Sequence, residues 1–226
     1  MSQASSPPAE QPAGWRAPAR AAGTTTLLLR HGQTPLSTER RFAGRGDIPL
    51  TETGLQQAAQ AAVMLAQRGP IDLVLTSPLA RTRQTAAAVA ERTGAPVAVD
   101  DDLAETDFGS WEGLTFADVM ERWPEQMKEW LRDADKAPPG GESFAAVGLR
   151  VEAALTRLLT DHSGKRVVVV SHVTPIKLLV CRALLAPTAA LFRMHLDVAS
   201  LTETVWFPDG PALLRSLNET AHLQQV

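Results

Sequence analysis

Hydrophobic positions along the chain fall into short unbroken aliphatic runs and longer stretches with helical spacing. A short continuous apolar run bounded by turn residues is typical of a strand buried on both faces. Such strands are expected at 26–29, 71–76, 96–99, 167–170, 201–207 and 213–217. Helical spacing predicts helices at 51–68, 142–162 and 174–185, and a further helix is expected to begin at Ser77-Pro78.

Residues typical of helix ends support these assignments. Thr51 is expected to cap one helix, and Gly69-Pro70 to end it. In Ser77-Pro78 a serine at the N-cap precedes a proline at the first helical position, which is the preferred order. This start would place Arg81 in the first turn of its helix.

Strands and helices alternate along most of the chain, which favours a mostly parallel sheet with helices on both faces. The expected fold class is therefore α/β, with three layers in the order α/β/α. Residues 1–23 are rich in Pro, Ala and Ser and are interpreted as a disordered tail or linker before a domain at 24–226. The less regular segment at about 102–141 is expected to form a helical excursion over the active site.

Two of the aliphatic runs lead directly into a histidine. His31 follows the first run, with Arg30 beside it, and His172 follows the run at 167–170. The carboxyl ends of parallel strands meet at one edge of the sheet, where ligands bind in open α/β folds. Arg81 would join this edge at a helix N-terminus, which favours an anion. Because arginine binds phosphoryl oxygens and imidazole can accept a phosphoryl group, the pattern indicates phosphoryl transfer through phosphohistidine.

Two other interpretations of these residues stay open. Each histidine could be a structural residue at the end of a strand. A zinc site would need three or more protein ligands, and two arginines beside the histidines would repel a cation. No metal and no cofactor is therefore expected.

Composition and charge narrow the class of partner. The length of 226 residues suits one domain with a sizeable core. A net charge of −3 gives no reason to expect nucleic-acid binding, and no apolar run approaches the ~18–20 residues of a membrane span. The first residues do not resemble a secretory signal. Cys181 stands in an apolar stretch and is interpreted as a buried small hydrophobe in a reducing cytoplasm.

Longer motifs extend the pattern over roughly residues 25–222. In chain order they are Leu29-Arg30-His31-Gly32-Gln33-Thr34, Asp47-Ile48-Pro49-Leu50-Thr51-Glu52-Thr53-Gly54, Thr76-Ser77-Pro78-Leu79-Ala80-Arg81-Thr82-Arg83-Gln84-Thr85-Ala86, Leu103-Ala104-Glu105-Thr106-Asp107-Phe108-Gly109-Ser110-Trp111-Glu112-Gly113, Pro139-Gly140-Gly141-Glu142-Ser143 and Val170-Ser171-His172. This series resembles the histidine phosphatase superfamily in its phosphoglycerate-mutase-like branch.

The resemblance implies a role for each matching position. His31 would be the phosphorylated nucleophile, and Arg30, Arg81 and His172 would form the phosphate pocket. Glu105 would donate a proton to the leaving oxygen and later activate water, which implies an acidic to near-neutral pH optimum.

Several further positions are candidates for the acid or for substrate contacts. The residues alone do not single out Glu105, because Asp107 and Glu112 are equal candidates. Substrate contacts beyond the residues already named are expected from Gln33, Thr34, Ser37 and Val173. Exposed arginines are common, so Arg41, Arg45 and Arg83 are expected to face solvent.

Departures from the mutase pattern favour hydrolysis. Glu105-Thr106-Asp107-Phe108-Gly109 carries an acidic pair where the mutases have basic residues that neutralise a glycerate carboxylate. Ser37 replaces the Asn that commonly follows the signature loop. The similarity is greatest to α-ribazole phosphatase-like proteins, in particular the acid phosphatase domain of actinobacterial bifunctional ribonuclease H–acid phosphatase proteins. Nothing before Thr24 could fold as such a nuclease.

The expected function is hydrolysis of a small phosphomonoester, such as α-ribazole 5′-phosphate or a sugar phosphate. A phosphoglycerate mutase and a non-catalytic phospholigand-binding protein remain as alternatives. The chain could be fused to, or derived from, a ribonuclease H-containing protein.

Overall fold

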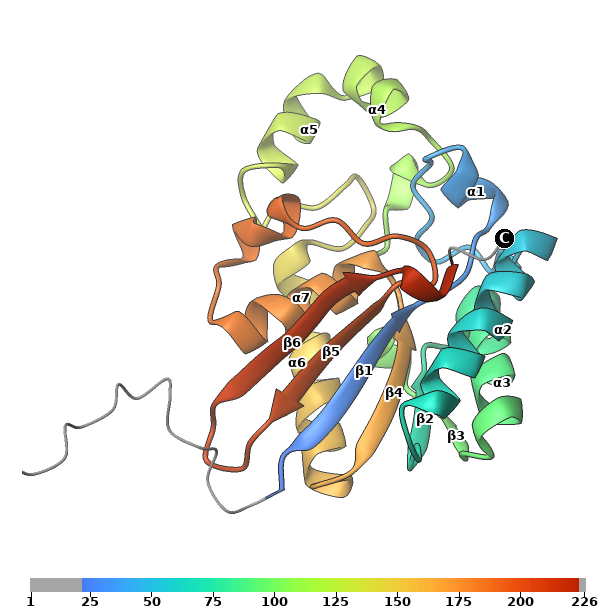
Figure 1. The fold of residues 1–226 in the computed structure, drawn as a ribbon. Helices are drawn as coiled ribbons and strands as arrows, with labels where there is room; N and C mark the ends of the chain where they lie inside the picture. The colour runs from blue at the N-terminus through green and yellow to red at the C-terminus, as the bar shows by residue number, and fades with distance from the viewer. Residues whose placement is uncertain (1–21, 224–226) are drawn as a thin grey trace, which may run out of the picture.

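A computed structural model describes residues 22–223, which form a six-stranded sheet with helices on both faces (Figure 1). The strands are β1 (Thr24–Arg30), β2 (Leu73–Thr76), β3 (Val97–Val99), β4 (Arg166–Ser171), β5 (Leu201–Trp206) and β6 (Ala212–Glu219), in the spatial order β3-β2-β4-β1-β5-β6. Strands β1 to β4 pair in parallel, whereas β5 is antiparallel to β1 and to β6. The predicted three-layer α/β fold with a mostly parallel sheet is confirmed.

Two pairs of helices form the outer layers of the fold. Helices α2 and α3 cover one face of the sheet, and α6 and α7 cover the other. The helices are α1 (Pro35–Thr38), α2 (Glu52–Gln67), α3 (Ala80–Thr93), α4 (Phe116–Arg122), α5 (Pro124–Trp130), α6 (Phe144–Asp161) and α7 (Val173–Leu184), with 3-10 turns η2 (Asp101–Leu103), η3 (Gly109–Trp111), η4 (Thr188–Arg193) and η5 (Ala221–Leu223). No helix among residues 22–223 is long and apolar enough to cross a membrane. The tail predicted at 1–23 lies outside the described residues except for its last two positions.

The period-two alternation of strand side chains divides the core into two halves. Leu27 and Leu29 of β1 pack with α2 and α3, whereas Leu28 points to the other face and packs with α6 and α7. The valines of β4 alternate in the same way. Because both faces are covered, these strands read as continuous aliphatic runs rather than as an alternating pattern.

The segment between η2 and α6 has a small core of its own. Trp111, Met127 and Trp130 are buried there, together with Phe144 and Cys181 from the helical layer. Cys181 is buried, as predicted, and its burial raises the pKa of the thiol. Figure 1 places α4 and α5 beyond the end of the sheet at which β1 and β4 finish.

The predicted start of the helix after β2 is wrong. Helix α3 begins at Ala80, and its N-cap residue is Leu79, which makes no side-chain cap. The Ser77 hydroxyl is bonded instead to Nε2 of His172, at 2.7 Å, and to the Thr82 hydroxyl, at 2.9 Å. The Ala80 N–H donates to the Asp47 carboxylate, so an anion of the protein itself occupies this helix N-terminus. Arg81 still lies in the first turn, as predicted.

Two glycines hold the loop after β1 against the start of α2. A Cβ at Gly32 would overlap the carbonyl oxygen of Gly54, and a Cβ at Gly54 would overlap the carbonyl oxygen of Gln33. The N–H of Thr51 also donates to the Gln33 carbonyl, at 2.9 Å. The backbones therefore touch where the chain leaves His31, and this contact fixes the path of the loop.

Gly54→Ala is expected to lower the free energy of unfolding by about 1–3 kcal/mol, because the added methyl group must displace backbone. Gly148→Ala is the matched control, since the nearest atom to its new Cβ lies 4.0 Å away, in the Leu178 side chain. Alanine in helix α6 should instead raise the free energy of unfolding by about 0.5–1 kcal/mol. Urea unfolding of both variants measures the difference, and equal effects would contradict the close contact.

Candidate active site

The register of two parallel strands brings His31 and His172 together. Arg30 and Ser171 are paired at the ends of β1 and β4, and the His31 N–H donates to the Ser171 carbonyl, at 3.1 Å. The residue that follows each strand end is a histidine, so both rings project from the same edge. Their centroids lie 5.2 Å apart, and both side chains are buried.

A hydrogen bond to the backbone fixes the tautomer of His31. Its Nδ1 lies 2.8 Å from the Gly32 carbonyl oxygen, which can only accept, so Nδ1 carries the proton. Nε2 therefore keeps its lone pair. Burial lowers the pKa of His31 well below its ordinary value, and the positive charges of Arg30 and Arg81 lower it further. The ring is accordingly a neutral imidazole with one nucleophilic nitrogen.

His172 is held in the opposite tautomer. Nε of Arg81 donates to its Nδ1, at 3.2 Å, so Nε2 carries the proton and donates it to the Ser77 hydroxyl. Burial also lowers the pKa of His172 well below its ordinary value, and the charge of Arg81 adds to this effect. His172 is therefore neutral and locked in orientation by two partners.

Arg81 lies behind the two histidines and does not line the cavity. The side chain is fully buried, and its terminal nitrogens donate to the backbone carbonyls of Ala43, Gly44 and Gly46. Burial lowers the pKa of its guanidinium below the usual range. The structure thus places Arg81 where its charge reaches both imidazoles, while its hydrogen bonds hold the loop at 43–46.

Arg30 does line the cavity. One terminal nitrogen donates to the Leu196 carbonyl, at 2.6 Å, while its buried Nε has no hydrogen-bond partner among the described residues. Burial lowers the pKa of Arg30 to about 10, so the guanidinium is still charged at neutral pH. An unpartnered buried N–H costs free energy, which an anion in the cavity would offset.

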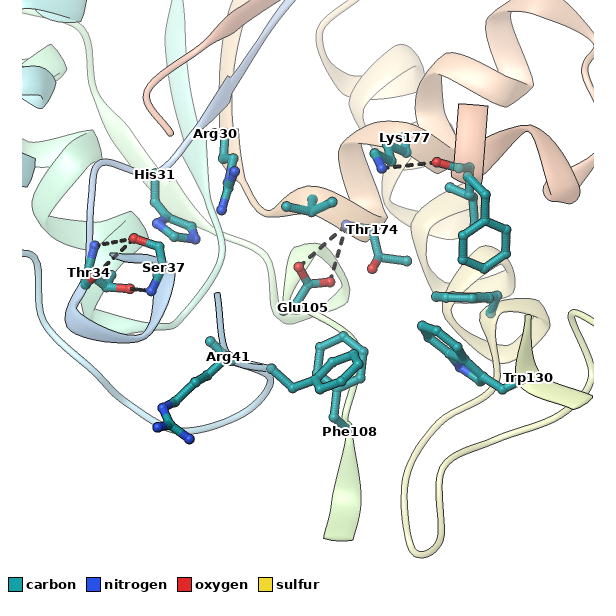
Figure 2. Close-up of a pocket in the computed structure, with 16 residues that line it drawn as sticks. Arg30, His31, Thr34, Ser37, Arg41, Glu105, Phe108, Trp130, Thr174 and Lys177 are labelled. Carbon is teal, nitrogen blue, oxygen red and sulfur yellow. Dashed lines mark hydrogen bonds between the residues drawn. The ribbon is translucent and has the colours of Figure 1, made fainter. Parts of the chain in front are cut away.

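Glu105 lies at the N-terminus of helix α7, the helix that begins directly after His172. Its carboxylate accepts hydrogen bonds from the backbone N–H of Thr106, at 2.8 Å, and from that of Thr174, at 3.3 Å. Figure 2 shows the contact with Thr174. The side chain is 5% exposed and lines the cavity. Asp107 and Glu112 do not line it. Glu112 instead accepts from the N–H groups of Gly44 and Gly46.

Arg150 of α6 holds the backbone on which Glu105 stands, and the sequence analysis did not identify it. Its guanidinium donates to the carbonyls of Asp102, Ala104 and Glu105, at 2.6–3.0 Å. It also forms an ion pair with Glu142, at 3.0 Å. The motif that contains Glu142 was visible in the sequence, but nothing marked an arginine eight residues later as its partner.

A cavity of about 240 Å³ collects most of the predicted site residues (Figure 2). Arg30, His31, Thr34, Ser37, Glu105 and Val173 line it, together with Thr174 and Lys177. Thr34 and Ser37 are bonded to each other in a capping box at the start of α1. Gln33 does not line the cavity, because its side-chain oxygen accepts from the Thr51 hydroxyl.

The three arginines expected to face solvent are half-buried to exposed, and each is paired with a carboxylate. Arg41 contacts Glu39, Arg45 contacts Glu142 and Arg83 contacts Asp47. Arg41 borders the cavity, but Figure 2 shows its guanidinium pointing away from the other labelled residues. Within residues 22–223 no three His, Cys, Asp or Glu side chains are grouped as a metal site requires.

Residues 26–219 match the family model of the histidine phosphatase superfamily (branch 1), so the chain belongs to this superfamily. It is 50% identical over 210 residues to the bifunctional protein Rv2228c of Mycobacterium tuberculosis, covering 93% of this chain and 57% of that protein. It is 33% identical over 195 residues to the adenosylcobalamin/α-ribazole phosphatase of Salmonella typhimurium, covering 86% of this chain and 96% of the relative.

A solved structure of mycobacterial glucosyl-3-phosphoglycerate phosphatase Rv2419c, in complex with VO₃, is similar with a TM-score of 0.79 and 33% identity. The likeness covers 87% of this chain and 99% of that one. The family indicated by the motifs is thereby confirmed. The chain spans 57% of the length of Rv2228c and of two further mycobacterial relatives at the same 50% identity.

Arg30→Met is expected to raise the pKa of His31, because it removes one of the two positive charges that disfavour the protonated ring. Arg41→Met is the control, since Arg41 borders the same cavity and does not contribute to that pKa. Titration of the imidazole nitrogens by ¹⁵N NMR measures both variants. An unchanged or lower pKa of His31 in Arg30→Met would contradict this electrostatic account.

Proposed function

We propose that this chain is a phosphomonoester hydrolase that works through a phosphohistidine at His31. The observation that carries the proposal is the state of His31, a neutral imidazole whose Nε2 lone pair is kept free beside a charged arginine. A buried neutral imidazole can act as a nucleophile, and a guanidinium stabilises the negative charge of the transferring phosphoryl group.

In the first step, Nε2 of His31 attacks phosphorus and the bond from phosphorus to the ester oxygen breaks. Glu105, in its protonated form, gives its proton to the leaving oxygen. In the second step, Glu105 removes a proton from water as the water oxygen attacks phosphorus, and the phosphorus–nitrogen bond breaks. Phosphate leaves, and His31 and Glu105 return to their initial states.

Arg81 and His172 act from behind in this mechanism. One ring nitrogen of His172 accepts from Arg81 and the other donates to the Ser77 hydroxyl, so we assign His172 a positioning role beside His31 and no role in proton transfer. The charges that depress the pKa of His31 come from Arg30 and Arg81, and the same field attracts a phosphate dianion. Two guanidiniums beside the histidines would repel a metal cation, which supports a metal-independent reaction.

The substrate we propose is a small phosphorylated metabolite resembling α-ribazole 5′-phosphate or a sugar phosphate. Relatives named for α-ribazole and glucosyl-3-phosphoglycerate phosphatase activity support this class. Similarity to Rv2228c, which is named bifunctional, supports a second activity in a longer protein of the same kind. Only the sequence resemblance indicates that this second activity is that of a ribonuclease H.

An acidic working range follows from the two protonation states that the first step requires. Because the pKa of His31 is lowered, its nucleophilic nitrogen stays free of a proton in mildly acidic solution, and the first step also requires Glu105 in its acid form. We therefore propose that the enzyme is an acid phosphatase.

Trapping the phosphoenzyme tests the proposal directly. Acid quenching during turnover of p-nitrophenyl phosphate destroys a phosphohistidine, whereas alkaline quenching should preserve it on the wild-type protein. His31→Ala should form none, because the attacking nitrogen is gone. His195→Ala is the control, since this exposed histidine pairs with Asp197 outside the cavity. A chelator should leave the rate unchanged, and vanadate should inhibit.

The same preparation separates the alternatives. With 3-phosphoglycerate as substrate, free phosphate supports a hydrolase, and the isomeric phosphoglycerate would identify a mutase. Binding of phosphate without any phosphoenzyme would identify a phospholigand-binding protein and overturn the proposal.

Glu105→Gln should lower kcat/KM for an alkyl phosphate by about 10²–10⁴-fold, because an alkoxide needs a proton to leave. The loss with p-nitrophenyl phosphate should be much smaller, since its leaving group departs as a stable anion. Arg150→Met should repeat this leaving-group dependence with a smaller loss, of about tenfold or more, because it frees the backbone that carries Glu105.

Arg157→Met is the matched control for Arg150→Met. Arg157 is also on α6 and pairs with Asp100 and Asp102, but it is half exposed and bonds to side chains rather than to the Glu105 backbone. Steady-state kinetics with both substrates measures the effect. An equal loss with both leaving groups in Arg150→Met would show a general structural defect instead of a displaced acid.

A further inference from the structure

The cavity that holds His31 has two chemically different ends. The polar groups gather at one end, where Arg30, His31, Thr34, Ser37 and Glu105 meet. At the other end the lining is aromatic, and the rings come from five separate parts of the chain. These rings are Phe42, Phe108, Trp130, Phe144 and Phe192.

The aromatic rings form one connected wall. Trp130 stands at its centre, with ring centroids 4.7 Å from Phe144 and 5.8 Å from Phe192. Phe42 and Phe108 continue the wall, 4.9 Å apart. Trp130 is buried, but Phe192 is 43% exposed, so part of this apolar surface stays uncovered. An exposed apolar surface inside a cavity is typical of a ligand site.

The direction of the proposed reaction points the leaving group toward this wall. In phosphoryl transfer the attacking and leaving atoms lie roughly in line on opposite sides of phosphorus. His31 is the attacking group and Glu105 is the acid that must reach the leaving oxygen. In Figure 2, Phe108 and Trp130 lie on the far side of Glu105 from His31. The alcohol part of the substrate would therefore leave the phosphate end in the direction of the rings.

The cations near this end do not favour a second anionic group. Arg41 is paired with Glu39 and turned away from the cavity. Lys177 donates to the Leu191 carbonyl, at 3.0 Å. Burial lowers the pKa of the Lys177 ammonium, and the charge of Arg30 adds to this effect. Neither side chain resembles the forked, unpaired donor that a carboxylate or second phosphate prefers.

We propose that the aromatic wall is a specificity subsite, and that the preferred substrate is a phosphomonoester whose alcohol carries an uncharged aromatic ring. The inference rests on the proposed function, because it uses the line from His31 through phosphorus to Glu105. It narrows the substrate class from any small phosphorylated metabolite to those with an apolar ring near the ester oxygen.

The test compares 2-phenylethyl phosphate with ethyl phosphate. Both release a primary alkoxide of similar basicity, so they differ mainly in the ring that the wall would bury. The ratio of their kcat/KM values should be about tenfold or more in favour of the ring, as expected for burying a ring of this size. A ratio near one would overturn the subsite.

Phe192→Ala should lower this ratio severalfold, because it removes an exposed part of the wall. Phe116→Ala is the matched control, since Phe116 is 46% exposed and stacks on Phe42 but does not line the cavity. The ratio should be unchanged there. Equal changes in both variants, or none in Phe192→Ala, would contradict the proposal.

Binding of the non-hydrolysable 2-phenylethylphosphonate and ethylphosphonate to the wild-type protein gives a second measurement that needs neither variant nor turnover. The phenyl compound should bind about tenfold more tightly by calorimetry. The two proposals fail differently in these experiments. Tight binding of the phenyl compound without hydrolysis would contradict the proposed function alone, whereas equal hydrolysis and equal binding of the two compounds would contradict the subsite alone.

Discussion

The parallel pairing of β1 with β4 is the constraint on which the rest of the site depends. Each strand contributes a buried aliphatic run to the core, and each run is followed by a histidine. A shift of register by one residue would exchange the two faces of a strand, so the packing of Leu27, Leu28 and Leu29 fixes where His31 stands. The hydrophobic core thereby sets the 5.2 Å separation of the two imidazole rings.

Burial next to positive charge determines the chemical state of those rings. Both imidazoles lie in a low-dielectric environment beside Arg81, and protonation of either would add a further buried cation. Each ring also has one nitrogen bonded to a fixed group, the Gly32 carbonyl for His31 and the Arg81 guanidinium for His172. The fold therefore selects the protonation state and the tautomer before any ligand enters.

The sequence predicted the fold, and it also predicted most of the residues that the structure groups around one cavity, because both depend on local patterns. Buried strands read as apolar runs, and residues that follow parallel strands meet at one edge, so His31 and His172 could be placed from position alone. The error at Ser77 has a physical cause. A serine before a proline is a good cap in isolation, but a neighbouring imidazole 95 residues later competes for the hydroxyl.

Long-range partners account for what the sequence did not indicate. Arg150 reaches three carbonyls on a distant segment, and an arginine in an amphipathic helix gives no sign of such contacts. Gln33 belongs to the signature loop, yet its side chain bonds to Thr51 instead of facing the cavity. Arg81 was expected to contact the ligand, but its terminal nitrogens donate hydrogen bonds to three backbone carbonyls instead.

The two ends of the cavity are anchored by different parts of the molecule. The two histidines follow the paired strands β1 and β4, whereas Phe108 and Trp130 belong to the separate small core between η2 and α6. Substitutions in that small core can change the shape of the aromatic wall without moving the two imidazole rings. This separation allows related proteins to bind different substrates while they keep the same catalytic histidine.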